Sequence, residues 1–373
     1  MISQNDIHHM RAAIALARTG LGRTAPNPSV GCIIVKQGRV LARARTADLG
    51  RPHAEALALE ELVKTRGGHE ATLYVTLEPC THHGQTPPCT QAIIEARMKR
   101  VVIGTLDLNP LVSGRSISML EDAGVQVDVM QGEIERECAS LNEGFFSSIK
   151  KEAPRPYVTL KTACSLDGKI ALASGESQWI TGQRARRHAH FLRSRHDAVL
   201  VGIGTVLKDD PMLNTRLEGV DHNPIRIVMD SQLKTPIESA LVKSAYARRL
   251  WVLHGKTEDD RQKSDAFLTS GVQTYEIDNI KDINYVLEFL AQKGITRLLV
   301  EGGALIHASF IRARAFDELV IYRAPSLLGE HAKNVSGDIN VNTLAHRYSL
   351  QIIERKPLGE DVMERYKPIT QSN

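Results

Sequence analysis

The sequence predicts an α/β protein of two domains, in which strands alternate with helices along the whole chain. Apolar runs of strand length recur throughout and are separated by segments of helical periodicity. The 373 residues exceed the roughly 100–200 that one domain usually holds. The alternation breaks at residues 144–157, where a charge run and two prolines read as a linker. We therefore expect one domain over residues 1–148, a linker over 149–156 and a second domain over 157–373.

The N-terminal half is expected to open with an amphipathic helix and to continue as an α/β sandwich around a mostly parallel sheet. Gln37, Gly38 and Arg39 separate two apolar runs and predict a hairpin. Further strands are expected at 72–78, 100–106 and 125–130, and helices at 53–65, 88–98 and 117–124. In the C-terminal half, strands are expected at 157–164, 197–204, 224–230, 249–255, 296–303 and 318–324, and helices at 180–195, 283–294 and 303–314.

Composition narrows the class of protein. Hydrophobic residues make up 42% and charged residues 24% of the chain, which is typical of soluble globular proteins. The net charge of +4 comes from dispersed Lys and Arg, which argues against a nucleic-acid partner. No apolar run reaches the roughly 18–20 residues that cross a membrane, and the N-terminus lacks a signal-peptide core, so a cytoplasmic location is expected. The five cysteines are widely spread, which argues against a disulfide framework: Cys32, Cys80, Cys89, Cys138 and Cys164.

Three segments of the N-terminal half carry a metal-binding pattern. His53 lies at the start of an expected helix, Cys80 follows a strand, and Cys89 starts the next helix. One imidazole and two thiolates are ligands for a single Zn2+ whose fourth position stays open for water, as in catalytic zinc sites. Glu55 lies two residues beyond His53 and is placed to move a proton. The order His-x-Glu, Pro-Cys and Cys is that of zinc nucleobase deaminases, although eight residues separate the cysteines here instead of the usual two.

The C-terminal half has two glycine-containing turns, at 201–205 and 300–304, each after an apolar strand. Backbone N–H groups exposed by glycine at the start of a helix can bind a phosphate. Neither turn has the GxGxxG spacing of a dinucleotide-binding Rossmann fold, so that class is disfavoured.

The longer motifs resemble one family. The stretch EPCTHHGQTPPC, with HAE upstream, is similar to the deaminase half of the bifunctional deaminase–reductases of riboflavin biosynthesis, in which the long insert between the cysteines is typical. APNPSVG and DLNP also resemble motifs of that half, while KTACSLDGKIA, SGESQWITG, DAVLVGIGTVLKDDPMLNTR and VEGG resemble the reductase half. The resemblance implies a cytidine-deaminase-like α/β/α sandwich followed by a dihydrofolate-reductase-like α/β domain.

The family implies two consecutive reactions on a phosphorylated pyrimidine. The first is hydrolytic deamination of 2,5-diamino-6-(5-phosphoribosylamino)pyrimidin-4(3H)-one, in which Glu55 would pass a proton to the leaving amine. The second is reduction of the ribosyl side chain by NADPH, which gives 5-amino-6-(5-phosphoribitylamino)uracil. Members often form homo-oligomers. In the deaminase half the resemblance places Asn27, Asp107 and Asn109 near the substrate, although such residues also favour turns.

In the reductase half the resemblance assigns roles to two sets of residues. The set for the nicotinamide cofactor is Ala163, Trp179, Thr205, Asp209, Ser231, Gly303, Ala304, Leu305, Ile306, His307, Ala308 and Ser309. The set for the substrate is Ser177, Arg193, Leu213, Arg216 and Glu301. Arg193 and Arg216 could grip a phosphate with forked hydrogen bonds, or could be ordinary surface charges. Asp209 is the acid–base candidate, and Trp179 could instead be a core aromatic.

This sequence departs from the family pattern at four positions. Gln85 stands where a cation usually faces the substrate phosphate, Thr46 where several relatives have His, and Leu108 and Ser116 replace Pro and Gly. Another cation could substitute for the one lost at Gln85, namely Arg45, Arg51 or Arg115. The departures keep open an alternative, a working reductase tethered to a degenerate deaminase. A deaminase of nucleic-acid bases would need a basic face with stacking aromatics, but aromatic residues are only 5% of the chain and scattered.

Overall fold

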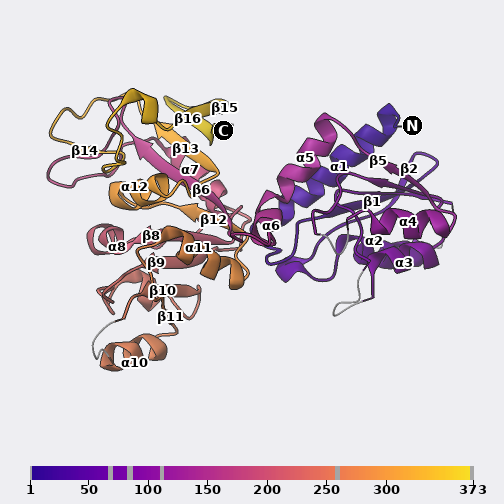
Figure 1. Cartoon of the computed structure of the whole chain (residues 1–373), viewed down its shortest axis with the longest axis horizontal. Coiled ribbons are helices and arrows are strands. Elements are labelled where there is room, and N and C mark those ends of the chain that lie inside the picture. The colour runs from indigo at the N-terminus through magenta and orange to yellow at the C-terminus, as the bar shows by residue number, and fades with distance from the viewer. Residues whose placement is uncertain (1, 66–69, 82–86, 110–112, 257–260, 370–373) are drawn as a thin grey trace. The chain divides into compact units, whose positions relative to one another are not determined.

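The chain forms two compact α/β units, Met1–Glu152 and Ala153–Asn373, in the computed structural model. The structure describes residues 2–65, 70–81, 87–109, 113–256 and 261–369. Figure 1 shows helices packed on a central sheet in each unit. The α/β fold class expected from the sequence is confirmed for both units. None of the helices in these described ranges is long and apolar enough to span a membrane.

The N-terminal unit is built on a five-stranded sheet of order β2-β1-β3-β4-β5. Its strands are β1 (Gly31–Lys36), β2 (Arg39–Arg45), β3 (Thr72–Val75), β4 (Arg100–Ile103) and β5 (Gln126–Val129). Its helices are α1 (Gln4–Gly20), α2 (Ala54–Thr65), α3 (Cys89–Glu95), α4 (Arg115–Asp122), α5 (Glu133–Leu141) and α6 (Glu143–Ser148), with the short 3₁₀ helix η1 (Asp48–Gly50). β1 pairs antiparallel with β2 and also with β3, so the sheet is mixed and not mostly parallel as expected.

Both faces of this sheet are covered, because successive side chains of a strand point to opposite sides. Cys32 and Ile34 of β1 join a core with α2, α3 and α4, whereas Ile33 and Val35 join a core with α1 and α5. The two helical layers can be followed in Figure 1. This arrangement leaves the ends of β3 and β4 to carry the loops in which Cys80 and Asp107 lie.

The C-terminal unit has a nine-stranded sheet of order β11-β10-β9-β8-β12-β6-β13-β16-β15. Its strands are β6 (Tyr157–Cys164), β8 (Ala198–Gly202), β9 (Ile225–Met229), β10 (Leu250–His254), β11 (Gln273–Glu276), β12 (Arg297–Val300), β13 (Glu318–Arg323), β15 (Leu350–Leu358) and β16 (Asp361–Pro368). β7 (Lys169–Ala171) and β14 (Lys333–Asn334) pair separately. Its helices are α7 (Gln183–Arg193), α8 (Ile203–Asp209), α9 (Ala240–Lys243), α10 (Arg261–Thr269), α11 (Ile283–Gln292) and α12 (Ala304–Arg312), with the 3₁₀ helix η2 (Leu344–His346).

Strand direction in this sheet changes at β13. The pairs from β11 to β13 are parallel, while β16 and β15 are added as an antiparallel hairpin that the sequence analysis did not predict. Most side chains of the edge strand β15 are exposed, and its ion pairs include Arg355 with Glu364 and Glu354 with Arg365. With so few buried apolar side chains, β15 gives no alternating pattern to detect.

The stretch 144–157, where the alternation of strands and helices breaks, starts inside helix α6. Phe146 of this helix is 8% exposed in the core of the N-terminal unit. The charge run and prolines that follow masked the apolar pair Phe145 and Phe146 in the pattern. The helical layer of this unit therefore extends to Ser148.

A buried ionic cluster fastens α1 to the sheet of the N-terminal unit. The Asp6 carboxylate accepts hydrogen bonds from Nη1 of Arg100 at 2.7 Å, from the Tyr74 hydroxyl at 2.8 Å and from the backbone N–H of Ser3 at 2.8 Å. Nε of Arg100 also donates to Asp128 at 2.7 Å. Burial alone would raise the pKa of Asp6, but Arg100 and the Ser3 and Tyr74 donors outweigh it and hold the pKa well below its ordinary value.

We predict that Asp6→Asn destabilises the N-terminal unit by about 3 kcal/mol near neutral pH, because Arg100 loses a buried partner. A depressed folded-state pKa contributes its full stabilisation above the unfolded pKa and loses it as pH falls toward the folded value, so the difference from wild type should shrink as pH falls below about 4. Both tryptophans, Trp179 and Trp251, lie in the C-terminal unit. The change should therefore appear in urea unfolding followed by far-UV circular dichroism and not by tryptophan fluorescence.

The control for this prediction is Glu137→Gln, which removes an exposed ion pair with Arg18 on the same layer. It should leave the transition nearly unchanged. Equal effects of the two variants would show that the Asp6 cluster adds nothing beyond an exposed pair.

Candidate functional site

Three side chains from separate segments meet in the N-terminal unit. His53 precedes α2, Cys80 follows β3, and Cys89 is the first residue of α3. Nδ1 of His53 lies 3.4 Å from Sγ of Cys89 and 3.7 Å from Sγ of Cys80. The candidate ligand atoms of the three residues all lie within 4.8 Å of one another. The sequence expectation that these residues converge thus agrees with the geometry.

The chemistry of this donor set suits zinc. One imidazole nitrogen and two cysteine sulfurs are ligands that zinc accepts, and three protein ligands leave a coordination position for a small molecule. The Cys89 side chain, the His53 ring and the backbone N–H of Cys89 hold the pKa of Cys80 at about 4, so that thiol is primed to be an anion. This N–H belongs to Cys89, the first residue of α3, so the start of the helix helps to stabilise the Cys80 thiolate.

Glu55 lies beside the cluster with an unsatisfied carboxylate. It is 3% exposed, and Oε2 has no hydrogen-bond partner among the described residues. Burial raises the pKa of Glu55 to about 7, against an opposing effect of His53. A buried carboxyl group with an unpartnered oxygen beside His53, Cys80 and Cys89 can exchange a proton with a ligand bound at these residues.

The three residues expected near a substrate in this unit are fixed by backbone bonds. Nδ2 of Asn27 donates to the carbonyl oxygen of Gly50 at 2.8 Å, which sets the orientation of its amide. Asp107 is buried, and its Oδ1 accepts the N–H of Asn109 at 2.8 Å. The Asn27 and Asp107 segments are thus preorganised turns, which is compatible with both the structural and the functional interpretation.

Two of the positions that depart from the family pattern, Thr46 and Ser116, have structural roles. Thr46 is 1% exposed, and its Oγ1 accepts the N–H of Val30 at 3.0 Å. Ser116 is fully buried, and its hydroxyl donates to Glu78 at 2.8 Å. Leu108 is 65% exposed. Gln85 lies outside the described residues.

Of the cations that could replace the one missing at Gln85, Arg45 is already engaged. Its Nη1 donates to the carbonyl of Thr46 at 2.6 Å and its Nη2 to Asp48 at 2.7 Å. Arg115 is exposed in the first turn of α4. Its exposure leaves Arg115 accessible to an anionic ligand.

The C-terminal unit contains a pocket of about 540 Å³ where the two glycine turns meet. Predicted site residues that line it are Ala163, Ser177, Thr205, Asp209, Glu301, Gly303, Ala304, Leu305 and Ile306. A Cβ at Gly202 or Gly302 would come within 2.7 Å and 2.6 Å of Ile306, so these glycines allow the turns to pack closely. A Cβ at Gly204 or Gly303 would meet nothing within 4 Å, so their backbones face open space. This is the arrangement that a cofactor phosphate needs.

An ion-pair cluster forms one wall of this pocket. Nε and Nη2 of Arg193 donate to the two carboxylate oxygens of Glu301 at 2.5 and 3.0 Å, and Nζ of Lys161 donates to Oε2 at 3.4 Å. Nη1 of Arg193 donates to the carbonyl of Asn214 at 2.9 Å. Burial alone would raise the pKa of Glu301, but Arg193 and Lys161 hold it well below its ordinary value. Arg193 therefore holds Glu301 in place, and its fork is not open toward a phosphate.

Arg216 is held by a neutral histidine. Burial, with the nearby charges of Arg193 and Arg216, lowers the pKa of His190 to about 4. Its Nδ1 donates to the carbonyl of Asn214 at 3.2 Å, so its Nε2 accepts from Nε of Arg216 at 3.3 Å. Arg216 is exposed, which suits its guanidinium for an anionic ligand.

Several predicted residues do not line this pocket. The side chain of Leu213 is 3% exposed in the hydrophobic core, so only its main chain can meet a substrate. His307 and Ala308 are buried residues of α12 and do not line the pocket, so the cofactor role that the resemblance assigns to them stays a prediction. Ser231 follows β9, and Ser309 bonds within α12 to the carbonyl of Leu305. Of the predicted stretch from Gly303 to Ser309, the four residues from Gly303 to Ile306 line the pocket.

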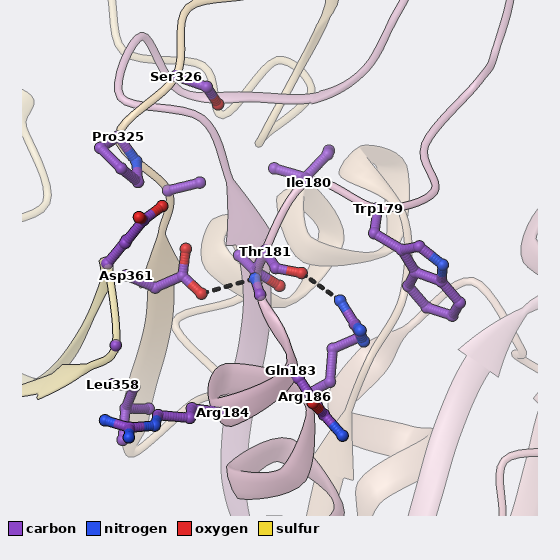
Figure 2. Close-up of a pocket in the computed structure, with 14 residues that line it drawn as sticks. Trp179, Ile180, Thr181, Gln183, Arg184, Arg186, Pro325, Ser326, Leu358 and Asp361 are labelled. Atoms are coloured by element: carbon purple, nitrogen blue, oxygen red, sulfur yellow. Dashed lines mark hydrogen bonds between the residues drawn. The ribbon is translucent and has the colours of Figure 1, made fainter.

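Trp179 lines a different hollow of about 520 Å³. It is 65% exposed, so it is not the core aromatic considered above. Figure 2 shows its indole beside Arg186, whose guanidinium carbon is 4.4 Å from the ring centroid. In the same hollow the N–H of Gly182 donates to Asp361 at 2.7 Å.

The sequence analysis missed two groups that the structure brings to the sites. Lys161 lines the pocket of the C-terminal unit, and the buried Glu78 lies two residues before Cys80 in the chain. Both lie inside quoted motifs, KTAC and EPC, but no spacing rule singles out either residue. The signal would have been a charged residue inside an apolar strand, for Lys161, or just after one, for Glu78.

Comparisons with known proteins follow the division into two units. The family described as "Cytidine and deoxycytidylate deaminase zinc-binding region" matches residues 3–105, and "RibD C-terminal domain" matches residues 156–363. Riboflavin biosynthesis protein RibD of Aquifex aeolicus is 40% identical, covering 98% of this chain and 99% of that protein. The Escherichia coli protein of the same name is 37% identical over 96% of this chain and 98% of its own length.

Solved structures agree with these sequence relatives. Acinetobacter baumannii RibD (form 2) superposes with a TM-score of 0.85 at 34% identity and covers 98% of this chain and 99% of its own. A Thermotoga maritima diaminohydroxyphosphoribosylaminopyrimidine deaminase/5-amino-6-(5-phosphoribosylamino)uracil reductase superposes with a TM-score of 0.84 at 34% identity, with 97% and 100% coverage. The similarity therefore extends over both units and not over one alone.

The ion-pair cluster predicts that Glu301→Gln destabilises the C-terminal unit by about 3 kcal/mol, because Arg193 and Lys161 keep their charges without a carboxylate. Tryptophan fluorescence during urea unfolding reports this unit and should show an earlier midpoint. Glu238→Gln removes an exposed ion pair with Lys243 and should give no measurable shift. An unchanged midpoint for Glu301→Gln would mean that water compensates the two cations.

Proposed function

The chain belongs to the RibD family of riboflavin biosynthesis proteins, and we propose a zinc site in its deaminase unit and an NADPH site in its reductase unit. It is a deaminase and reductase of riboflavin biosynthesis. The observation that carries the zinc proposal is the convergence of His53, Cys80 and Cys89 beside the vacant carboxylate oxygen of Glu55. The alternative of a degenerate deaminase half is not favoured, since ligands and carboxylate are all in place.

In the deaminase unit, His53, Cys80 and Cys89 would hold Zn2+. When bound, the metal supplies a water activated for attack on the pyrimidine carbon that bears the exocyclic amine. The substrate would be 2,5-diamino-6-(5-phosphoribosylamino)pyrimidin-4(3H)-one. Glu55 accepts a proton at its vacant oxygen and gives it to the amine, which leaves as ammonia. Asn27, Asp107 and Asn109 orient the pyrimidine, and Arg115 is the cation that we assign to the substrate phosphate.

In the reductase unit, the turns that begin α8 and α12 would hold the phosphates of NADPH at their open glycine backbones. The cofactor supplies a hydride to C1′ of the ribosyl group in its ring-opened imine form. Asp209, at the end of α8, supplies the proton that completes reduction to the ribityl group. Glu301, held by Arg193 and Lys161, binds substrate hydroxyls, and Arg216 binds the substrate phosphate.

The coupled reaction tests the two activities together. We expect the chain to oxidise NADPH when the diaminopyrimidinone is added, and also when the already deaminated intermediate is added. Spectrophotometric loss of NADPH and assay of released ammonia follow the two steps. Turnover of the deaminated intermediate alone would contradict a working deaminase unit.

Glu55→Gln should retain one zinc per chain and lose deamination by roughly a hundredfold or more, because general acid–base catalysis is removed while the ligands stay. Zinc is measured by atomic absorption and deamination by ammonia release. Glu60→Gln on the exposed side of α2 is the matched control. Asp209→Asn is the reciprocal variant and should slow only NADPH oxidation. Normal ammonia release from Glu55→Gln would exclude Glu55 as the proton carrier.

A further inference from the structure

The carboxylate of Glu78 is buried and collects hydrogen bonds from one loop of the deaminase unit. Glu78 follows β3 and is 3% exposed. Its Oε2 accepts the N–H of Asp107 at 3.2 Å and the N–H of Gly114 at 3.1 Å. Its Oε1 accepts the N–H of Ser116 at 3.3 Å and the Ser116 hydroxyl at 2.8 Å. The backbone N–H of Glu78 donates to the carbonyl of Thr105 at 3.0 Å, so main chain and side chain grip the same loop.

These bonds stabilise the carboxylate without a cation. No ion pair to Glu78 occurs among the residues that the structure describes. A buried carboxylate is costly unless donors replace its water, and here backbone amides and one hydroxyl do so. Gly114 is the N-cap of α4 and Ser116 lies in its first turn, and the positive end of the helix dipole also favours the negative charge.

A single carboxylate oxygen of Glu78 binds both Asp107, after β4, and Gly114, before α4. Since Oε2 binds the amides of both Asp107 and Gly114, it fixes the point where the loop leaves the β4 end and the point where it enters α4. Cys80 lies only two residues beyond Glu78 in the chain. The Glu78 side chain therefore connects the segment that carries the candidate metal ligand Cys80 to Asp107. Asp107 in turn binds the N–H of Asn109.

We propose that Glu78 is a positioning residue for deamination, which sets the distance between the metal ligand Cys80 and the substrate-orienting residues Asp107 and Asn109. The proposal rests on the proposed function of this site. It also gives Ser116 a role, because a glycine there could not donate the bond from the hydroxyl. The same bonds hold the residues on both sides of Arg115.

The hydrogen bonds to Glu78 require that both of its side-chain oxygens act as acceptors. Glu78→Gln removes one of these acceptors and therefore tests the proposal. An amide has one oxygen, so its NH₂ group must face either the amides of Asp107 and Gly114 or that of Ser116. We expect full-length Glu78→Gln to keep one zinc per chain while KM for the diaminopyrimidinone rises roughly tenfold, with a smaller change in kcat. Faster hydrogen exchange in peptides covering 105–118 should accompany the rise. NADPH-dependent reduction of the deaminated intermediate should be unchanged.

Two further variants keep the test decisive. Ser116→Ala removes one of the four bonds and should raise KM roughly threefold with zinc retained, even if Glu78→Gln folds poorly. Asp6→Asn weakens the same unit from the layer of α1 and should leave KM unchanged. If Asp6→Asn raised KM as much as Glu78→Gln, the rise would reflect loss of stability of the whole unit and not the position of Asp107 and Asn109. That result would overturn the proposal.

Other outcomes separate the proposal from the function on which it rests. An unchanged KM in Glu78→Gln and Ser116→Ala, with wild-type deamination intact, would overturn the role of Glu78 and leave the proposed function standing. Loss of zinc from Glu78→Gln would show that the residue acts through Cys80 alone, which also overturns it. Absence of ammonia release from the wild-type chain would refute the proposed function itself.

Discussion

A carboxylate that leaves water must find its hydrogen bonds inside the protein, and this constraint organises both units. Asp6 draws α1 onto the sheet through Arg100, and Glu78 draws together the two ends of a loop. Asp197 accepts the N–H groups of Thr296 and Arg297, both at 2.8 Å, which ties the start of β8 to the start of β12. In each case, one buried charge fixes segments that are far apart in the chain. Of these three carboxylates, Glu78 is the one that contacts the segment carrying Asp107.

Much of the fold follows from periodicity, because long apolar strands and amphipathic helices leave a local pattern. The expected strands at 157–164 and 249–255 and the helix at 283–294 appear within a few residues of their predicted ends. Features set by long-range pairing were missed. The hairpin β15–β16 is too exposed to alternate clearly, and α6 hides beside a charge run. The antiparallel pairing of β1 with β3 depends on where the chain returns to the sheet, which no local window contains.

The sites divide in the same way. His53, Cys80 and Cys89 could be paired from sequence because metal ligation needs particular atoms in a known order. Arg193 could not be interpreted correctly, since whether a guanidinium faces a phosphate or a carboxylate depends on Glu301, which is remote in sequence. Leu213 and His307 were assigned by resemblance, but the packing of their side chains is visible only in three dimensions. A sequence motif is thus a reliable guide to the segment that contacts the ligand. It is a less reliable guide to the atoms that make the contact.

The strand β15 ends the nine-stranded sheet and has consequences for how this protein behaves at high concentration. A long edge strand offers unpaired backbone groups to any other extended chain. Here Glu354, Arg355, Lys356 and Pro357 occupy consecutive edge positions, and two of these charges are held by Arg365 and Glu364 of β16. A chain that added itself to this edge would have to bury several charges and accommodate a proline. The edge thereby protects the sheet from open-ended stacking and fibre growth.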